Sequence, residues 1–298
     1  MKIPNEHEIK VRNLLQQISA GELSPVSDEL IEEAGEQFKQ SLRKQFTEPR
    51  KDFTLRMSNL GRPTCQLWFQ KHYPDMAEEK QYDFVMRMLI GDSVEVLSLF
   101  VMKLAGVPVE SVSGKVSMDL DGDTINGEYD VVIDGKVWDV KSASPYSFQN
   151  KFKDFASMRN DDPFGYVSQG YGYARASGKP FGGWIVVNKS TGEMKFVEAE
   201  EDPKLIKTVE ADMIDTKRTL ERDLPLKRCF EDVEETYRKK PTGNRHLGMT
   251  CAFCDYKFQC WDNLQYKPSA ASTAKTRPWK YYTVYNETET TDEVQQGG

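Results

Sequence analysis

The residues with the clearest chemical potential lie between Gly127 and Lys141. Two acids, Asp130 and Asp139, and one base, Lys141, stand in the stretch Gly-Glu-Tyr-Asp-Val-Val-Ile-Asp-Gly-Lys-Val-Trp-Asp-Val-Lys. Two carboxylates held side by side raise each other's pKa unless a cation lies between them. Hard divalent ions such as Mg²⁺ prefer such oxygen ligands. This set of residues therefore suggests a metal site with a positive charge beside it.

The same stretch also predicts how these side chains are positioned. Asp134-Gly135 separates two short β-branched runs, which is a strong signal for a two-residue hairpin turn. Side chains alternate between faces along a strand, so Asp139 and Lys141 share one face, and antiparallel pairing places Asp130 opposite Asp139. A solvated hairpin with a charged face is the simpler alternative. It explains poorly why two acids lie in the most β-branched stretch of the chain.

A second candidate site consists of cysteines. Cys251, Cys254 and Cys260 fall within ten residues, and Cys65 lies far upstream. Three explanations compete: disulfides, which a reducing compartment disfavours, a structural zinc site, and an iron–sulfur cluster, which four thiolates also hold. Zinc usually pairs two Cys-x2-Cys motifs, and here there is one. Cys229 stands apart in an expected amphipathic helix, where packing is the simplest role.

Three further residues are candidates because of their setting alone. Glu95 lies in a strongly apolar helical segment, and a buried acid needs a partner. A salt bridge to an arginine would satisfy it, and so would a metal ion. Gln169 and Tyr173 are four residues apart in an expected helix and therefore share a face.

Taken together, these features resemble a known family. An acid, a short hairpin and Asp-x-Lys look like the core of the PD-(D/E)XK nuclease superfamily, and the cysteine spacing is similar to that of its RecB-like iron–sulfur exonuclease branch. That branch includes CRISPR-associated exonucleases and AddB-type nuclease domains. The family's boxes occur in order, as Gly91–Glu95 with Glu in place of the usual His, Gly127–Asp130, Asp139–Lys141 and Gln169–Tyr173. Such an ordered set is more specific than any single box.

The resemblance implies a metal-dependent deoxyribonuclease that hydrolyses DNA phosphodiester bonds as an exonuclease. Glu95, Asp130, Asp139 and the Val140 carbonyl would hold one or two Mg²⁺ or Mn²⁺ ions, and Lys141 would stabilise developing negative charge. Gln169 would orient Lys141 or the phosphate, and Tyr173 would contact DNA or pack the site. Cys65, Cys251, Cys254 and Cys260 would bind a [4Fe-4S] cluster, with structural Zn²⁺ as the alternative.

The implied partner is DNA, with a free end or single-stranded, in recombination, repair or phage DNA processing. A recombination or replication protein is a possible further partner, and CRISPR adaptation is an alternative pathway. Two other classes of protein remain open. One is a non-catalytic DNA-binding or regulatory protein with a nuclease-like fold, and the other is a zinc-stabilised structural protein.

The order of helices and strands expected from the sequence predicts an α/β fold, in which a central mixed β-sheet flanked by helices positions these residues. Helices are expected at residues 8–20 and from Ser27, strands at 107–118 and 182–188, and a long helix from Leu205 to Tyr237 that breaks at Pro225. We expect an N-terminal helical segment at 1–58, a nuclease domain with the cysteines at 59–268, and a tail at 269–298 whose end is disordered.

Composition narrows the class of protein. The chain has 298 residues, 38% of them hydrophobic, which is enough for a substantial core, and its net charge of −7 argues against a protein that coats DNA passively. No apolar run approaches the length of a membrane span, and the N-terminus lacks the apolar stretch of a secretory signal. These features predict an intracellular, cytoplasmic protein without membrane contact.

Overall fold

The computed structural model describes residues 4–22, 24–49, 52–222 and 227–286, in two compact units. Unit 1 comprises Met1–Pro63 and Lys80–Arg222, and unit 2 comprises Thr64–Glu79 and Asp223–Gly298. The two units are interleaved along the chain, whereas the segments expected from the sequence are consecutive. The tail expected to be disordered extends beyond residue 286 and so falls partly outside the described residues.

Unit 1 is built on a five-stranded mixed sheet in the order β1-β2-β3-β4-β5. The strands are β1 (Val109–Leu120), β2 (Asp123–Ile133), β3 (Lys136–Ala143), β4 (Phe181–Asn188) and β5 (Met194–Glu198). All neighbours are antiparallel except β3 and β4, which are parallel. A parallel pair needs a long crossover, which here carries α5 (Pro145–Gln149), η2 (Lys151–Lys153), α6 (Phe155–Asn160) and α7 (Tyr166–Ser177).

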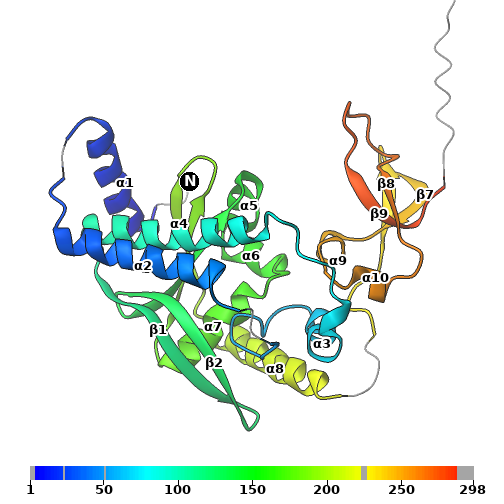
Figure 1. Ribbon diagram of the computed structural model, residues 1–298, viewed down its shortest axis with the longest axis horizontal. Coiled ribbons are helices and arrows are strands. Elements are labelled where there is room, and N and C mark those ends of the chain that lie inside the picture. The colour runs from blue at the N-terminus through cyan, green and yellow to red at the C-terminus, as the bar shows by residue number, and fades with distance from the viewer. Residues whose placement is uncertain (1–3, 23, 50–51, 223–226, 287–298) are drawn as a thin grey trace, which may run out of the picture. The chain divides into compact units, whose positions relative to one another are not determined.

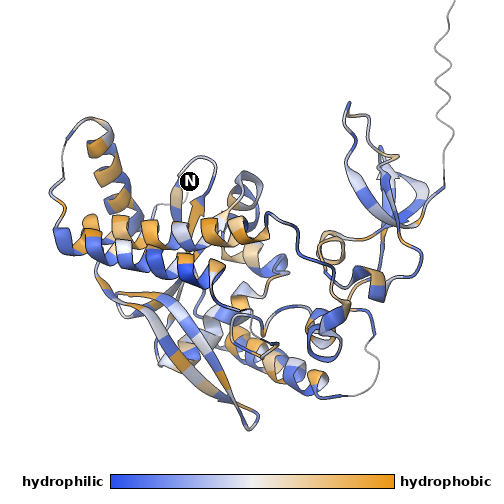
Figure 2. Ribbon diagram, in the orientation of Figure 1, coloured by the Kyte–Doolittle hydropathy of each residue, from blue (hydrophilic) through white to orange (hydrophobic). Residues whose placement is uncertain are grey.

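Helices pack against both faces of this sheet. On one face, α1 (Glu6–Ser19) and α4 (Phe84–Leu104) contribute to a core with Val131, Ile133 and Trp138. On the other, the crossover helices and α8 (Pro203–Leu220) surround Val132, Trp184 and Val186. The helix α2 (Asp28–Phe46) runs alongside α4 and is far more hydrophilic than it (Figures 1 and 2). The predicted α/β class with a central mixed sheet is therefore confirmed.

Unit 2 combines short helices with a second sheet of four antiparallel strands, ordered β6-β7-β9-β8. Its helices are α3 (Thr64–His72), η1 (Pro74–Met76), α9 (Met249–Ala252) and α10 (Lys257–Cys260), and its strands are β6 (Val233–Tyr237), β7 (Lys240–His246), β8 (Gln265–Pro268) and β9 (Trp279–Val284). The ring of Phe69 stacks on Tyr256 at 5.4 Å, and Lys257 pairs with Glu78. These contacts join α3 and the turn after it to the C-terminal part of the unit.

The sequence-based assignment of one long helix from Leu205 to Tyr237 is wrong. The helix α8 ends at Leu220, and Val233–Tyr237 is the strand β6. The apolar spacing continues past Leu220, but pairing of β6 with β7 buries Glu235 in the second sheet. Tertiary pairing thus overrides the helical pattern.

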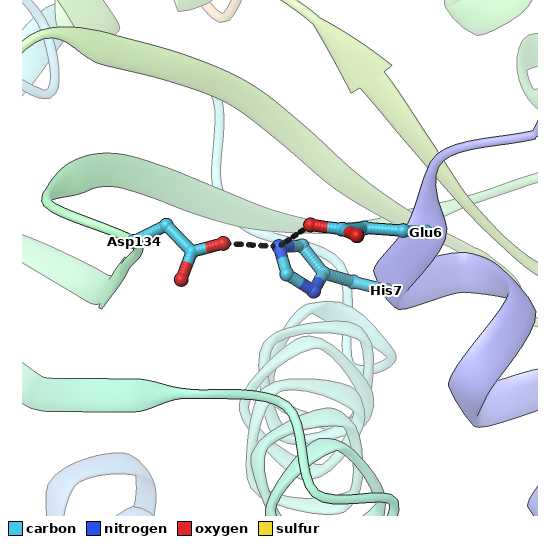
Figure 3. Close-up of side chains that lie close together, drawn as sticks. All are labelled: Glu6, His7 and Asp134. Carbon is cyan, nitrogen blue, oxygen red and sulfur yellow. Dashed lines mark ion pairs between the residues drawn. The ribbon is translucent and has the colours of Figure 1, made fainter.

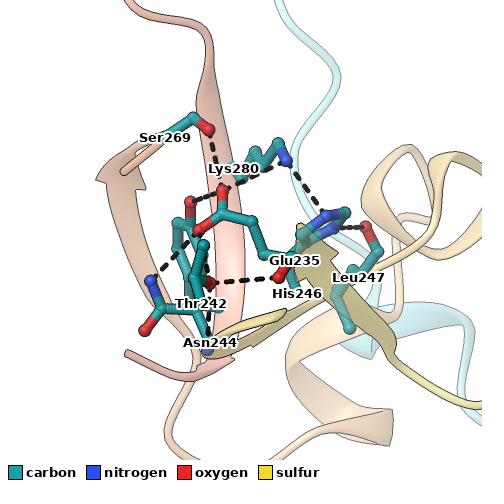
Figure 4. Close-up of polar contacts among 8 residues, drawn as sticks. Glu235, Thr242, Asn244, His246, Leu247, Ser269 and Lys280 are labelled. Atoms are coloured by element: carbon teal, nitrogen blue, oxygen red, sulfur yellow. Dashed lines mark hydrogen bonds and ion pairs between the residues drawn. The ribbon is translucent and has the colours of Figure 1, made fainter. Parts of the chain in front are cut away.

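Glu235 is the buried centre of the unit 2 sheet, with only 1% of its surface exposed. Its carboxylate accepts hydrogen bonds from Tyr282 at 2.6 Å, Ser269 at 2.7 Å and Asn244 at 3.1 Å, and Lys280 Nζ lies 3.3 Å away (Figure 4). Burial alone would raise the pKa of Glu235, but these donors outweigh it and lower the pKa to about 2. Glu235 is therefore a fully satisfied structural acid.

Within the described residues, no helix is both long and apolar enough to cross a membrane.

Candidate active site

The predicted hairpin forms and brings the two acids together. Its turn has positive φ at both Asp134 and Gly135, at 48° and 69°, as a type I′ turn requires. The antiparallel register of β2 and β3, continued by one pair, sets Asp130 beside Asp139. Asp130 Oδ2 also accepts a hydrogen bond from the Val140 N–H at 2.6 Å, which fixes this carboxylate against the neighbouring strand.

Lys141 lies on the same face of β3 as Asp139, as the alternation of side chains along a strand predicts. Its Nζ is 2.6 Å from Asp139 Oδ2 and 4.7 Å from the centre of the Tyr166 ring. Tyr166 begins α7, on the crossover, so a residue distant in sequence covers the ammonium group with an aromatic face. No sequence motif marked Tyr166, because its role depends on this long-range contact.

The site holds two acids and one lysine, and burial together with their mutual charges shifts the pKa of all three. Burial raises the pKa of Asp139, which is 1% exposed, although Lys141 opposes the shift. Burial, and then the charges of Asp139 and Glu95, hold the pKa of Asp130 well above its ordinary value. For Lys141, burial would lower the pKa, but the charges of Asp139 and Asp130 outweigh it and raise it. The lysine therefore stays protonated while the acids are poorly compensated.

The Asp139 carboxylate is also short of hydrogen bonds. Among the described residues, no hydrogen bond of good angular geometry reaches either of its oxygens. Its polar neighbours are Lys141, whose Nζ lies 2.6 Å away, and Asp130, and contacts with both lower its pKa against the effect of burial. Buried polar atoms without such partners are rare in folded proteins. Together with Asp130 beside it, this donor set is suited to a hard divalent cation, which would supply both the missing charge and the missing contacts.

Glu95 lies on α4, half-buried, close enough to influence the hairpin electrostatically. Burial raises its pKa, the charges of Lys44 and Lys141 oppose this, and Asp92 and Asp139 add to it. Within the described part of the chain it forms no ion pair, so the arginine salt bridge considered above does not occur there. Its carboxylate does not approach both Asp130 and Asp139 within 4.8 Å. Glu95 is thus at the edge of the site.

Gln169 and Tyr173 lie on one face of α7, as predicted, and are both buried. Gln169 Nε2 donates to Tyr173 Oη at 2.9 Å, so the described partner of Gln169 is Tyr173 and not Lys141. Burial, and then the charge of Asp139, raises the pKa of Tyr173. A Cβ at Gly127 would lie 2.7 Å from the Tyr173 ring, so glycine at this position of β2 allows the close approach.

A different group of possible metal ligands lies at the tip of the hairpin. Glu6, His7 and Asp134 place their ligand atoms within 4.8 Å of one another, and His7 Nε2 is 2.9 Å from Asp134 (Figure 3). His7 is 5% exposed, and its Nδ1 has no hydrogen-bond partner among the described residues. A metal-bound histidine normally donates its other N–H to an acceptor. The geometry therefore suits a His7 that donates its Nε2–H to Asp134 and ties α1 to the turn.

The five cysteines all belong to unit 2. Cys65 lies in the first turn of α3, and its N–H donates to the Cys229 sulfur at 3.0 Å. Cys229 is exposed and lies outside any helix, so its assignment to packing in an amphipathic helix is wrong. No local pattern in the sequence indicated this contact, because 164 residues separate the two positions.

The other three cysteines flank the short helices α9 and α10. Burial, and then the charge of a neighbouring thiol, raises the pKa of Cys251 and of Cys260. Burial also raises the pKa of Cys254, to about 11. The pKa of Cys65 is also raised, first by its hydrogen bond with Cys229 and by burial, and to a smaller extent by the charge of Cys260. The four predicted cysteines and Cys229 therefore lie near enough within unit 2 to influence one another electrostatically.

The spacing of these thiols bears on which metal they suit. No three of the described cysteine sulfurs lie within 4.8 Å of one another. Tetrahedral zinc with bonds of about 2.3 Å needs sulfurs about 3.8 Å apart. A four-iron cluster spreads its thiolates more widely, because each binds a different iron. The iron–sulfur cluster therefore stays a prediction, with structural zinc as its alternative.

Comparison with protein-family models gave no match, and neither did comparison with curated proteins. Among solved structures, the chain is similar to the crystal structure of SSO0001, with 14% sequence identity and a TM-score of 0.38. That match covers 76% of this chain and 95% of the other.

Proposed function

We propose that this protein is a divalent-metal-dependent DNA exonuclease of the PD-(D/E)XK type. The observation that carries the proposal is the pair Asp130 and Asp139 on neighbouring strands, with Asp139 buried, Asp130 half-buried, and Lys141 Nζ 2.6 Å from Asp139 Oδ2. The order of sequence boxes supports DNA as the substrate, with a role in recombination, repair or phage DNA processing.

Asp130, Asp139 and the Val140 carbonyl would hold the first Mg²⁺ or Mn²⁺ ion. Glu95, which lies farther away, would reach it or a second ion by rotation of its side chain. A bound divalent ion lowers the pKa of its water and neutralises charge on the scissile phosphate. Since both aspartates have raised pKa values, loading releases protons, and metal affinity falls as the pH falls.

Lys141 acts through its positive charge. Its raised pKa keeps the ammonium group protonated at neutral pH, so it cannot take a proton from water. It can donate hydrogen bonds to the attacking water or to a phosphate oxygen as negative charge develops there. Water attacks phosphorus, the bond to the leaving oxygen breaks, and the products are one phosphate end and one hydroxyl end.

The residues on α7 position this lysine and its surroundings. The Tyr166 ring covers the ammonium group and keeps it oriented toward Asp139. Tyr173 packs against Gly127 of β2, and its hydrogen bond with Gln169 holds the ring in place. Gln169 and Tyr173 support the strand that carries Asp130, which makes them positioning residues.

We further propose that the cysteines of unit 2 hold a structural [4Fe-4S] cluster through Cys65, Cys251, Cys254 and Cys260. Cys65 comes from the segment before Lys80, and the other three follow residue 223. A shared cluster would close a very long loop, and the chain-entropy relation used for disulfides gives roughly 4–5 kcal/mol for such a closure. Cluster binding adds to this, because the site cannot preform in the unfolded chain.

Cleavage of end-labelled linear and circular DNA, with Mg²⁺, Mn²⁺ or a chelator, tests the nuclease proposal. We expect metal-dependent degradation of linear DNA that Asp139→Asn abolishes, whereas Asp119→Asn, an exposed acid on β1, leaves activity unchanged. Full activity of Asp139→Asn would reject the assignment. Folded protein that binds DNA but never cleaves it would favour the non-catalytic alternative.

Elemental analysis of anaerobically purified protein tests the cluster. We expect a brown preparation with roughly four irons per chain. Serine at Cys65, Cys251, Cys254 or Cys260 should give colourless, poorly soluble protein. Because Cys229 is exposed and outside the proposed ligand set, Cys229→Ser should retain iron. Stoichiometric zinc without iron would replace the cluster with a zinc site.

A further inference from the structure

The β8–β9 hairpin of unit 2 carries a row of aromatic side chains on one face. Tyr266 pairs with Tyr281 across the two strands, and Pro268 pairs with Trp279. The Tyr266 ring stacks on Tyr281 with centroids 4.6 Å apart and lies 5.1 Å from the Trp279 ring. These rings form one continuous surface, because residues at alternate positions share a face.

This aromatic face is open to solvent. Tyr266 is 53% exposed and Trp279 is 55% exposed. The opposite face of the hairpin holds Tyr282, which is fully buried and donates a hydrogen bond to Glu235. The hairpin is therefore anchored through this face and, on the other, through Tyr281, which is half-buried and packs edge-on against Phe258 at 5.8 Å. The rings of Tyr266 and Trp279 beside it are displayed to solvent.

The charge of the hairpin is the second observation. From Gln265 to Val284 there are four basic residues, Lys267, Lys275, Arg277 and Lys280, and no acidic residue. Lys280 is paired with Glu235 on the anchored face, and the other three basic residues leave a local excess of positive charge in a chain whose net charge is −7. Lys275 and Arg277 are exposed on the loop that joins the strands. Such a surface complements a flexible polyanion with flat rings.

We propose that the β8–β9 hairpin binds single-stranded DNA, with bases stacked on Tyr266 and Trp279 and phosphates held by Lys275 and Arg277. A duplex is a poorer fit, since its base faces are already stacked inside the helix. The inference rests on the proposed nuclease function and deepens it, because it names single-stranded DNA as the form of DNA that the protein binds outside the metal site.

Binding of fluorescein-labelled oligothymidylate, followed by anisotropy in EDTA with the full-length protein, tests this directly and requires no cleavage. Stacking of one base on an aromatic ring contributes enough for a reduction of roughly five- to hundredfold in affinity when the ring is removed. We expect such a reduction for Tyr266→Ala and for Trp279→Ala, and recovery of most affinity in Tyr266→Phe. Tyr82→Ala, which removes an exposed aromatic ring of unit 1, is the matched control.

The salt dependence separates phosphate binding from stacking. For a single strand, removal of one ion pair with a phosphate reduces the slope of log affinity against log salt by about 0.7. Lys275→Ala and Arg277→Ala should each reduce the slope in this way, whereas the aromatic variants should leave it unchanged. Circular dichroism of each variant checks that the sheet is intact.

Three outcomes would overturn this proposal. Both aromatic variants could bind single strands as tightly as the wild type does. The wild type could bind a blunt duplex of the same length as tightly as a single strand, or bind no single strand at all. If the protein cleaves DNA and the aromatic variants bind normally, the surface is rejected and the nuclease assignment stands. If those variants lose binding but the wild type never cleaves DNA, the binding surface stands and the nuclease assignment is rejected.

Discussion

Asp139 in the unit 1 sheet and Glu235 in the unit 2 sheet are equally buried, each with 1% of its surface exposed. Their pKa values nevertheless move in opposite directions. Glu235 has five donors arranged around it, whereas Asp139 has one lysine and a second acid beside it. Burial alone therefore does not identify a functional acid; the balance of its partners does.

The first and largest test removes the one counter-charge of the unit 1 acids. Lys141→Ala leaves Asp139 as an unpaired buried charge and should destabilise unit 1 by about 3–5 kcal/mol in the absence of divalent metal. Adding Asp139→Asn should restore most of this stability, because the orphaned charge is then gone. Urea unfolding read by pulsed hydrogen exchange of unit 1 peptides measures both effects.

The matched control for that experiment is Lys189→Ala, at an exposed lysine after β4, which should change stability little. If Lys141→Ala were as stable as the wild type, the acids of unit 1 would be neutral or otherwise compensated. The contrast with Glu235 would then disappear.

The second test removes the charge of Glu235, the acid whose hydrogen-bond partners are all in place. Glu235→Gln weakens the hydrogen bonds from Tyr282 and Ser269 and leaves Lys280 without its carboxylate. We expect unit 2 to be destabilised by roughly 2–3 kcal/mol, since hydrogen bonds to a charged group each contribute about 1.5–3 kcal/mol. Hydrogen exchange of β6 to β9 measures this, and unchanged protection would show that Glu235 is not the centre of that sheet.

The third test uses pH, which should act oppositely on the two units. The folded pKa of Glu235, about 2, lies below its ordinary 4.5, so its stabilising contribution, about 3 kcal/mol, is full above pH 4.5 and is lost as the pH falls through 2. The folded pKa values of Asp130 and Asp139 lie above 3.8. Without divalent metal, their contribution is therefore lost as the pH rises through those raised values.

The free energy of unfolding of each unit, measured in chelator across acidic pH, should fall with rising pH for unit 1 and with falling pH for unit 2. Parallel pH profiles in the two units would contradict the comparison. Addition of Mg²⁺ should flatten the profile of unit 1 only.

The smallest expected effect concerns Glu95, at the edge of the site. Glu95→Gln should raise the Mg²⁺ concentration that half-activates cleavage by roughly tenfold, in the range seen for residues that support a metal site from outside its nearest ligands. Asp92→Asn, on the same helix and paired with Lys44, serves as the control. An unchanged metal titration would assign Glu95 to a structural role.

The sequence was most informative where the signals are local. Asp134-Gly135 predicted the turn, and strand alternation then predicted that Asp139 and Lys141 share a face, as the structure shows. The α/β class and its mixed sheet followed from the same reasoning. The roles of Asp130, Asp139 and Lys141 in catalysis stay predictions, as does the iron–sulfur cluster.

The sequence failed where structure depends on distant partners. Tyr166 meets Lys141 only because the crossover after β3 returns along the sheet. Cys229 meets Cys65 across 164 residues, and β6 forms only because β7 pairs with it. None of these contacts has a periodic or spacing signal, since the energy comes from tertiary packing.

The interrupted course of unit 2 along the chain has a consequence for protein synthesis. The helix α3 leaves the ribosome early, but the rest of its unit begins only after Arg222. At ordinary elongation rates, the synthesis of Lys80–Arg222 takes on the order of ten seconds. During that interval Phe69, which stacks on Tyr256 in the finished protein, lacks its partner. Chaperones that hold exposed apolar segments would therefore act on the nascent chain at this helix.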